Sequence, residues 1–204
     1  MSTTVKTICL ALTGASGMPY GLRLLESLLA AGCKVQLLYS QAAQIVARQE
    51  MDFDLPSRPS DARAALLARY PAVNPENLAV FGREEWFAPV ASGSNPPDAM
   101  IVCPCSMGTL AGIAQGLSDN LIERAADVVL KESRKLVIVP RETPFSAIHL
   151  ENMLRLSRAG AIILPPNPGF YHHPKSVEDI VDFVVARILD QVGVAHQLMQ
   201  RWGE

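Results

Sequence analysis

The segment NLIERAADVVLKESRKLVIVPRETPF, residues 120–145, contains the two patterns that decide the fold prediction. Its first part, residues 120–135, has apolar residues three and four positions apart with charged residues between them, which is typical of an amphipathic helix. Its second part, LVIVP at 136–140, is a continuous run of β-favouring apolar residues, typical of a strand that is buried on both faces. A helix that leads directly into such a strand predicts a parallel sheet with helices packed on its faces.

The same alternation of strands and helices extends along the chain in both directions. Short apolar runs predict further buried strands, at residues 5–12, 34–40, 99–104 and 161–165. Apolar residues at helical spacing predict further helices, at residues 20–32, 40–50, 149–160 and 176–192. Ser40 and Ser176 stand where N-caps are expected, and Gly32 and Gly160 stand where helices are expected to end. The predicted fold class is therefore α/β, with a three-layer, doubly wound, mostly parallel sheet.

A chain of 204 residues predicts one domain over 1–204, large enough to bury a substantial core. Residues 51–98 hold many of the prolines and a helical run at 62–70, and we interpret them as an irregular active-site or insertion region. Residues 193–204 are interpreted as a C-terminal tail. The hydrophobic content of 49% is at the top of the range for a soluble domain, which suggests surface buried between subunits.

The charge is nearly balanced, with 18 Lys and Arg against 20 Asp and Glu and a net charge of −2. The sequence therefore lacks the basic excess that favours nucleic acid or an anionic membrane surface. The N-terminal apolar run spans only about eight residues, and no window approaches the roughly 20 residues of a membrane span. We expect a soluble, cytoplasmic protein.

The four cysteines predict buried packing positions rather than a metal site. Cys9 and Cys33 lie in apolar runs, and Cys103 and Cys105 form a C-P-C sequence. Zinc sites usually need wider cysteine pairs together with a second pair or histidines, and this sequence has neither. We expect all four to be small buried hydrophobic side chains, and we expect no bound metal.

Two of the predicted strands end in sequences that suit a bound anion. TGASGMPYG at 13–21 supplies two glycines for a tight turn and a serine hydroxyl at the start of a helix. In PCSMGT at 104–109, Ser106 and Thr109 have N-cap spacing and can direct hydroxyls and free N–H groups at one phosphate. A structural turn and a plain N-cap explain these residues about as well, taken alone. Since both G-x-G-x-x-G and the P-loop lysine are missing, FMN fits better than a nucleoside triphosphate.

Further candidates each have an ordinary structural explanation as well. Arg124 and Lys131 share one stripe of the predicted helix, where they would equally form a solvated, salt-bridged face. Arg141 and Glu142 follow directly on LVIVP, where a surface salt bridge would be of little consequence. Three more candidates stand in a loop, among turn residues and on the last helix, namely Trp86, Tyr171 and Arg187.

Taken together, these segments closely resemble the UbiX/Pad family of flavin prenyltransferases. The resemblance rests on TGASGMPYG, ASGSN, CPCSMGTLAGIAQGLSDNLIERAADVVLKE, LVIVPRETPFSAIHLENM and PGFYHHPKSVEDIVDFVVARILD, in this order and spacing, from about residue 6 to residue 192. It implies a flavodoxin-like (Rossmann-like) subunit that assembles as a homododecamer, with active sites between subunits. The implied reaction joins the dimethylallyl group of dimethylallyl monophosphate to N5 and C6 of reduced FMN, without a metal. The prenylated FMN then serves a UbiD-type decarboxylase, as in ubiquinone biosynthesis.

The resemblance also implies roles for individual residues. The FMN-binding positions correspond to Gly14, Ala15, Ser16, Ser40, Ser106, Met107, Gly108, Thr109 and Arg141. The positions around the prenyl phosphate correspond to Ser16, Arg124 (expected from a neighbouring subunit), Lys131, Arg141, Glu142, Tyr171 and Arg187, with Trp86 near the prenyl chain. The catalytic positions correspond to Ser16, Glu50, Lys131 and Glu142. The sequence departs from the family where lysine and arginine are common, at Gly108 and Ser133.

These residue types suit the implied chemistry. Breaking the C–O bond to the phosphate develops negative charge on the leaving oxygens, which the lysine and arginines of the second set can stabilise. The aromatic face of Trp86 can stabilise the allyl cation. Ring closure at C6 releases a proton, for which Glu142 and the departing phosphate are the candidate bases, while Glu50 is a candidate acid–base group at the flavin.

Three alternative activities have less support from the sequence. Flavin-containing cysteine decarboxylases have a similar fold, but PRETPFSA at 140–147 replaces their P-x-M-N-x-x-M-W sequence. The histidines that follow, His149, His172 and His173, are interpreted as loop or helix-surface residues. A simple FMN-binding electron carrier would not need a second cluster of cations. Direct decarboxylation of an aromatic acid has no supporting set of residues.

Overall fold

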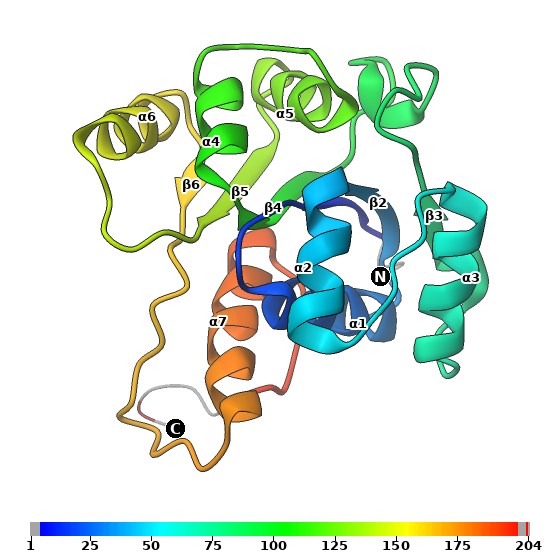
Figure 1. Cartoon of the computed structure of the whole chain (residues 1–204), viewed down its shortest axis with the longest axis vertical. Helices are drawn as coiled ribbons and strands as arrows, with labels where there is room; N and C mark the ends of the chain where they lie inside the picture. Colours follow the sequence, from blue (N-terminus) through cyan, green and yellow to red (C-terminus); the bar gives the residue numbers. More distant parts are fainter. Residues whose placement is uncertain (1–4, 200–202, 204) are drawn as a thin grey trace.

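A computed structural model describes residues 5–199 and 203 of the chain. Six strands form one sheet in the order β3-β2-β1-β4-β5-β6 (Figure 1). The strands are β1 Thr7–Leu12, β2 Lys34–Tyr39, β3 Leu78–Val80, β4 Ala99–Cys105, β5 Lys135–Pro140 and β6 Ile162–Ile163. The helices are α1 Met18–Ala30, α2 Gln41–Met51, α3 Pro59–Arg69, α4 Met107–Ala114, α5 Leu121–Lys131, α6 Ala147–Arg158 and α7 Val177–Val192. Two short 3-10 turns, Pro75–Asn77 and Pro89–Ala91, lie between α3 and β4.

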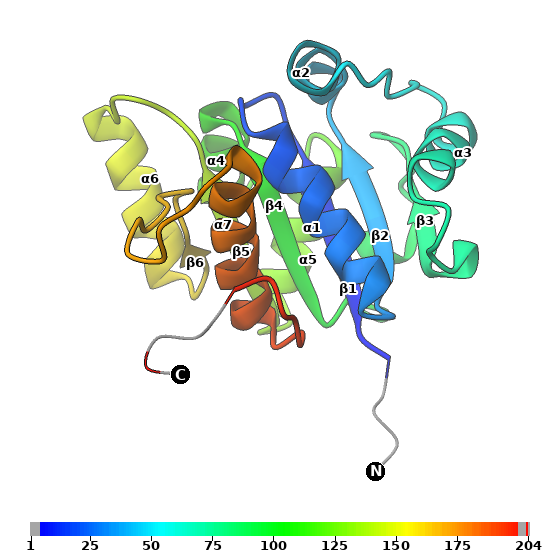
Figure 2. The ribbon, with the colours of Figure 1, turned by 90° about the horizontal axis from the view of Figure 1, so that it is seen from below.

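Helices cover both faces of the sheet because its central strands are apolar on both faces. In β1, Ile8 and Leu10 are buried with the side chains of α1 and α7, whereas Cys9 and Ala11 are buried with those of α4, α5 and α6. This division follows from the alternation of side chains along a strand. Figure 2 shows α1 and α7 in front of the sheet, with α5 behind it. The predicted three-layer, doubly wound α/β fold is confirmed, and every strand pair is parallel.

The strand order reverses between β1 and β4, which are neighbours at the centre of the sheet. β1 continues into α1 on one face of the sheet, while β4 continues into α4 on the other face. The chain therefore diverges above the carboxyl ends of these two strands. In doubly wound sheets this switch point is where ligands bind.

Both edges of the sheet differ from the sequence prediction. The segment predicted as irregular, residues 51–98, contains α3 and also the edge strand β3, which pairs with β2. A strand of three residues is too short to show an apolar pattern, so only its pairing reveals it. At the other edge, β6 is shorter than predicted because Pro165 and Pro166 lack the N–H groups that would extend the pairing.

The predicted helix ends and cysteine environments are confirmed. Ser40 and Ser176 cap α2 and α7, and Gly32 and Gly160 follow α1 and α6 with positive φ angles. All four cysteines are buried and free, and burial raises the pKa of the thiols in β1 and β4. The expected C-terminal tail, 193–204, lies partly outside the described residues. Within the described ranges, no helix is long and apolar enough to cross a membrane.

A buried hydroxyl joins the two strands at the switch point. Thr13, fully buried just after β1, donates a hydrogen bond from Oγ1 to the Pro104 carbonyl of β4 at 2.8 Å. The same Oγ1 accepts a hydrogen bond from the Ser106 N–H at 2.8 Å. The Thr13 N–H also donates to the Pro104 carbonyl, at 3.2 Å. One side chain therefore binds backbone groups on both sides of Cys105, the last residue of β4.

We expect Thr13→Val to lower the free energy of unfolding by about 1–3 kcal/mol, because it leaves the Ser106 N–H without a partner and removes one of the two hydrogen bonds that the Pro104 carbonyl accepts. Thr13→Ser keeps the hydroxyl and should lose less. Urea unfolding followed by circular dichroism measures both changes. A valine variant as stable as the wild type would contradict a structural role for the hydroxyl.

Candidate functional site

A pocket of about 420 Å³ opens at the switch point, above the carboxyl ends of β1, β2 and β4. Its lining combines main-chain turns, three helix starts and one guanidinium group, from Gly14, Ser40, Gln41, Ala42, Arg83, Ser106, Gly108, Thr109, Asn120, Ile122 and Glu123. Five of these residues were assigned to FMN binding from the sequence, namely Gly14, Ser40, Ser106, Gly108 and Thr109. The fold therefore brings these five residues, which lie up to 95 positions apart in the sequence, into one pocket.

Three helices begin at this pocket, and each has a polar N-cap. Ser40 Oγ accepts from the Ala43 N–H at 3.1 Å at the start of α2. Asn120 Oδ1 accepts from the N–H groups of residues 122 and 123, at 3.0 and 3.1 Å, at the start of α5. Each helix start carries a partial positive charge and free N–H groups, so three of them at one pocket favour an anion.

The start of α4 offers two hydroxyls as well as N–H groups. Ser106 Oγ accepts from the Thr109 N–H at 3.3 Å and forms a hydrogen bond with the Thr109 hydroxyl at 3.0 Å. The Ser106 N–H is fixed by Thr13, so the link between the strands also orients this helix start. The N–H groups of Ser106 and Thr109 thus have partners within the chain, which leaves the two hydroxyls and the other N–H groups of the first turn as donors for a phosphate monoester.

Gly14 allows the loop after β1 to approach α2 closely. A Cβ atom at this position would lie 2.3 Å from Cβ of Ala42, a distance that real Cβ atoms do not adopt. A Cβ atom at Gly108 would have no heavy atom of the described residues within 4 Å, apart from its chain neighbours and the backbone of its own helix. Gly108 therefore borders open space. The floor of the pocket thus depends on a glycine at 14, whereas position 108 has room for a side chain.

Glu50, predicted as an acid–base group, binds the start of α1. Its Oε2 accepts hydrogen bonds from the Gly17 N–H at 2.9 Å and the Met18 N–H at 2.8 Å. Gly17 has a φ angle of 123°, which favours glycine. The carboxylate therefore joins the C-terminal end of α2 to the loop that carries Ala15 and Ser16, and its negative charge lies at the positive end of α1.

Arg141 and Glu142 follow β5 and point to different partners. Arg141 Nε donates to the Ser16 carbonyl at 3.2 Å, which places this guanidinium beside the loop after β1. Glu142 Oε1 accepts from the Thr143 N–H at 3.0 Å. Among the ion pairs of the described residues, none joins Arg141 to Glu142. Both residues also line a separate hollow of about 290 Å³ beside Pro140.

The other predicted phosphate-binding cations do not line the switch-point pocket in this chain. Each instead has an acidic partner on or next to its own helix, in the pairs Arg124–Asp127 at 2.9 Å, Lys131–Glu132 at 2.5 Å and Arg187–Asp190 at 2.7 Å. Arg124 also donates to the Ala91 carbonyl at 3.0 Å. Lys131 ends α5, about 15 Å along the axis from the helix start at the pocket. The residues predicted to surround the prenyl phosphate are therefore dispersed over one subunit.

The residues that line the pocket likewise do not include Trp86 or Tyr171, the predicted aromatic residues of that set. Trp86 is 45% exposed in the segment before the second 3-10 turn. Tyr171 is 52% exposed and packs by its ring edge against Phe183 of α7. His149 caps α6 through its Nδ1, and His172 and His173 lie in the loop before α7, as predicted. Both ring nitrogens of His172 are buried, which the sequence did not indicate.

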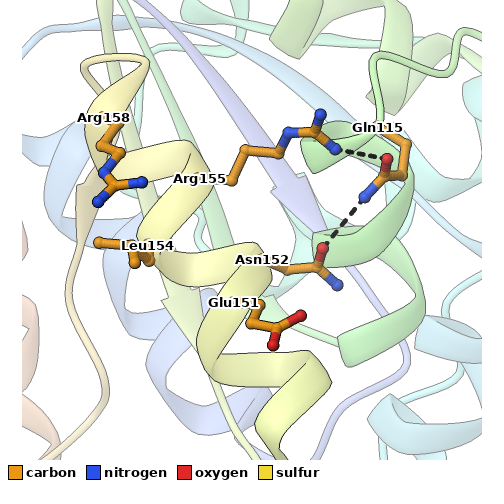
Figure 3. A pocket seen from close by; sticks show the side chains of 6 residues that line it. All are labelled: Gln115, Glu151, Asn152, Leu154, Arg155 and Arg158. Carbon is orange, nitrogen blue, oxygen red and sulfur yellow. Dashed lines mark hydrogen bonds between the residues drawn. The ribbon is translucent and has the colours of Figure 1, made fainter.

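A second hollow, of about 380 Å³, lies between α4 and α6 and contains none of the predicted site residues (Figure 3). Arg155 donates to Oε1 of Gln115 at 2.6 Å, and Gln115 donates to Oδ1 of Asn152 at 3.2 Å. This row of hydrogen bonds holds α6 on α4. No group of three or more His, Cys, Asp and Glu side chains in the described part of the chain is arranged to hold a metal ion.

Six of the eleven lining residues were not predicted from the sequence, and Arg83 and Asn120 are two of them. Asn120 had a readable signal, since an asparagine directly before the apolar-periodic run LIERAADVV is typical of an N-cap. Arg83 had none, because it lies in an irregular segment. It reaches the pocket because its carbonyl accepts a hydrogen bond from the Leu121 N–H at 2.8 Å.

The model of the Flavoprotein family matches residues 1–189, and the chain belongs to this family. Within it, the chain belongs with the UbiX flavin prenyltransferases. It is 57% identical to the flavin prenyltransferase UbiX of Pseudomonas aeruginosa, over 97% of this chain and 94% of that protein.

Two solved structures share the fold at high similarity. AnUbiX (PadA1) in complex with FMN and dimethylallyl pyrophosphate matches with a TM-score of 0.86 and 41% identity, over 98% of this chain and 99% of that one. A dodecameric FMN-dependent UbiX-like decarboxylase from Escherichia coli O157:H7 matches with a TM-score of 0.85 and 43% identity, over 97% of this chain and 100% of that one.

We expect Gly14→Ala to lower the free energy of unfolding by about 1–3 kcal/mol, because the new methyl group collides with Ala42 and displaces α2. Gly108→Ala adds the same methyl group to a helix where space is open, and should be neutral or stabilise by up to about 1 kcal/mol. Urea unfolding of both variants provides the comparison. Equal stability of the two would contradict the close contact between the loop and α2.

Proposed function

We propose that this protein is a flavin prenyltransferase that joins the dimethylallyl group of dimethylallyl monophosphate to N5 and C6 of reduced FMN. The observation that carries the proposal is the switch-point pocket, where three helix starts and the hydroxyls of Ser106 and Thr109 converge in a chain of the UbiX family. The prenylated FMN would then be delivered to a UbiD-type decarboxylase in the cytoplasm, for example in ubiquinone biosynthesis.

The pocket residues fit FMN as a ligand. The hydroxyls and N–H groups at the start of α4 suit its phosphate, as does Ser40 at the start of α2. The loop that contains Gly14, Ala15 and Ser16 forms the adjacent wall, beside Arg141. We assign the FMN site to the residues expected from the sequence, with Arg83 and Asn120 as additional members.

The prenyl phosphate would be held by the second set of residues. Cleavage of its C–O bond sends the electron pair to the phosphate oxygens, and fixed cations stabilise the charge that develops there. A monophosphate carries nearly two negative charges at neutral pH, and several lysine and arginine side chains can neutralise them in place of a metal ion. The face of Trp86 would stabilise the allyl fragment by up to about 2 kcal/mol.

Assembly of several copies would complete this second set. Arg124, Lys131 and Arg187 lie away from the pocket of their own subunit, so we propose that neighbouring subunits supply cations to each active site. The dodecameric relative supports this arrangement, and we propose a homododecamer. Exposed apolar side chains on α6 are available for contacts between copies, namely Ile148, Leu150 and Leu154.

Two carboxylates would handle the protons of the reaction. Ring closure at flavin C6 releases a proton, which Glu142 or the departing phosphate accepts. Glu50 already accepts hydrogen bonds from the turn beside Ser16. It would therefore act as an acid–base group at the flavin while it also holds this turn in place. Its two contributions are separable by experiment.

The alternative activities have less support. Solved cysteine decarboxylases share 16–19% sequence identity with this chain, which is a likeness of fold alone. The sequence PRETPFSA stands where the cysteine decarboxylases have the run that completes their site. A simple FMN carrier would bind FMN but form no new flavin.

We expect anaerobic incubation with reduced FMN and dimethylallyl monophosphate to give a flavin heavier by one C5 unit in mass spectrometry. A parallel incubation with dimethylallyl diphosphate shows which phosphate is preferred. Unmodified FMN in both incubations would refute the enzyme proposal, and would leave a flavin-binding protein as the alternative.

We expect Glu50→Gln to keep a thermal unfolding temperature close to the wild-type value, because its amide oxygen still accepts from the start of α1, while product formation falls by at least tenfold. Glu50→Ala should lose product formation and also about 1 kcal/mol of stability, as is usual when a helix cap is removed. Full activity of the glutamine variant would leave Glu50 with its structural role only.

A further inference from the structure

Two residues of the segment between β6 and α7, Tyr171 and His172, form an aromatic cluster with Phe183 of α7. The ring of His172 stacks on the ring of Phe183, with centroids 5.2 Å apart and an angle of 12° between the planes. Tyr171 meets both rings edge-on, at 5.9 Å and 79° from His172 and at 5.8 Å and 76° from Phe183. Phe183 belongs to the buried face of α7, so the cluster fixes the segment to the core.

Gly169 is the backbone position on which the cluster closes. A Cβ atom there would lie 2.7 Å from Cε1 of Tyr171 and 3.0 Å from Cζ of Phe183. Both atoms belong to rigid rings, which cannot yield as a flexible side chain would. Only glycine therefore allows Tyr171 to fold back over residue 169 while it remains in contact with Phe183.

His172 serves this cluster through the shape of its ring. Neither of its ring nitrogens has a hydrogen-bond partner among the described residues, and both are buried. Buried polar atoms normally have partners, so the polarity of the imidazole contributes nothing favourable to these contacts. The imidazole of His172 therefore contributes as a flat ring that packs between Tyr171 and Phe183 of α7.

We infer that Gly169, His172 and Phe183 are positioning residues for Tyr171, and that they hold its hydroxyl ready for the phosphate of the prenyl donor. This inference rests on the proposed function. Tyr171 is packed along its ring edges yet 52% exposed, so its direction is fixed while the side chain remains accessible. A hydroxyl that is already oriented need not be ordered when the phosphate binds, which strengthens binding.

The test compares two glycine-to-alanine variants of the full chain. Gly169→Ala displaces Tyr171 and should raise KM for dimethylallyl monophosphate about five- to tenfold, the change expected from the loss of one aromatic contact. Gly82→Ala is the matched control, because its Cβ would have only an ordinary contact at 3.6 Å with Pro59. FMN affinity should not change in either variant. An unchanged KM in Gly169→Ala would overturn the inference.

Two substitutions at His172 separate ring shape from general stability. His172→Phe retains a flat ring and should keep KM for the prenyl donor near the wild-type value. His172→Ala removes the ring and should raise KM as Gly169→Ala does, again without loss of FMN affinity. If phenylalanine raised KM as much as alanine, the assignment of His172 as a spacer would be wrong.

A measurement without turnover keeps this inference separate from the proposed function. In ligand-free protein labelled with fluorotyrosine, Tyr171→Phe assigns the 19F resonance of Tyr171. That resonance should shift in Gly169→Ala and not in Gly82→Ala. A wild-type protein that formed no prenylated FMN would refute the proposed function. An unshifted resonance in Gly169→Ala would instead refute the inference that the aromatic cluster positions Tyr171.

Discussion

The hydrogen bonds of Thr13 hold together the point where the fold divides. β1 and β4 lie side by side, but their chains leave toward opposite faces of the sheet, so backbone groups at their ends lack the pairing that continues elsewhere. The buried hydroxyl supplies that pairing to Pro104 and Ser106. Because Ser106 is also the N-cap of α4, the same contact fixes the direction of one helix start at the pocket. The stability of the core and the geometry of the site thus share one side chain.

Main-chain groups and small side chains provide most of the switch-point pocket. Three helix starts deliver partial positive charge without a desolvated cation, and their N-caps are already satisfied within the chain. Close approach of the loop after β1 to α2 requires Gly14, and the link from Glu50 to the start of α1 holds the other end of that loop. Three walls of the pocket belong to the helices α2, α4 and α5, whose buried faces pack in the core and limit their movement.

The sequence predicted the layers of the fold and half of the site, for reasons that concern particular residues. Continuous apolar runs such as LVIVP identify buried parallel strands, and Ser40, Ser106 and Ser176 identify helix starts, because both signals are local. The strand β3, the pocket position of Arg83 and the burial of His172 escaped prediction, because each depends on contacts with distant segments. The family resemblance implied that the cations around the prenyl phosphate come together in one site. In a single subunit these cations lie apart.

The two anions in the proposed reaction would be recognised by different means. The FMN phosphate would meet helix starts and hydroxyls, whose charge is partial and fixed in place. The prenyl phosphate would meet full cations that each have an acidic neighbour, in the pairs Arg124–Asp127, Lys131–Glu132 and Arg187–Asp190. Such partly exposed pairs are worth only about 0–1 kcal/mol, so a phosphate with nearly two charges can displace the carboxylates where several cations meet. One cation alone, as in a separate subunit, would gain little from that exchange. Affinity for the prenyl donor would therefore depend on assembly of the subunits.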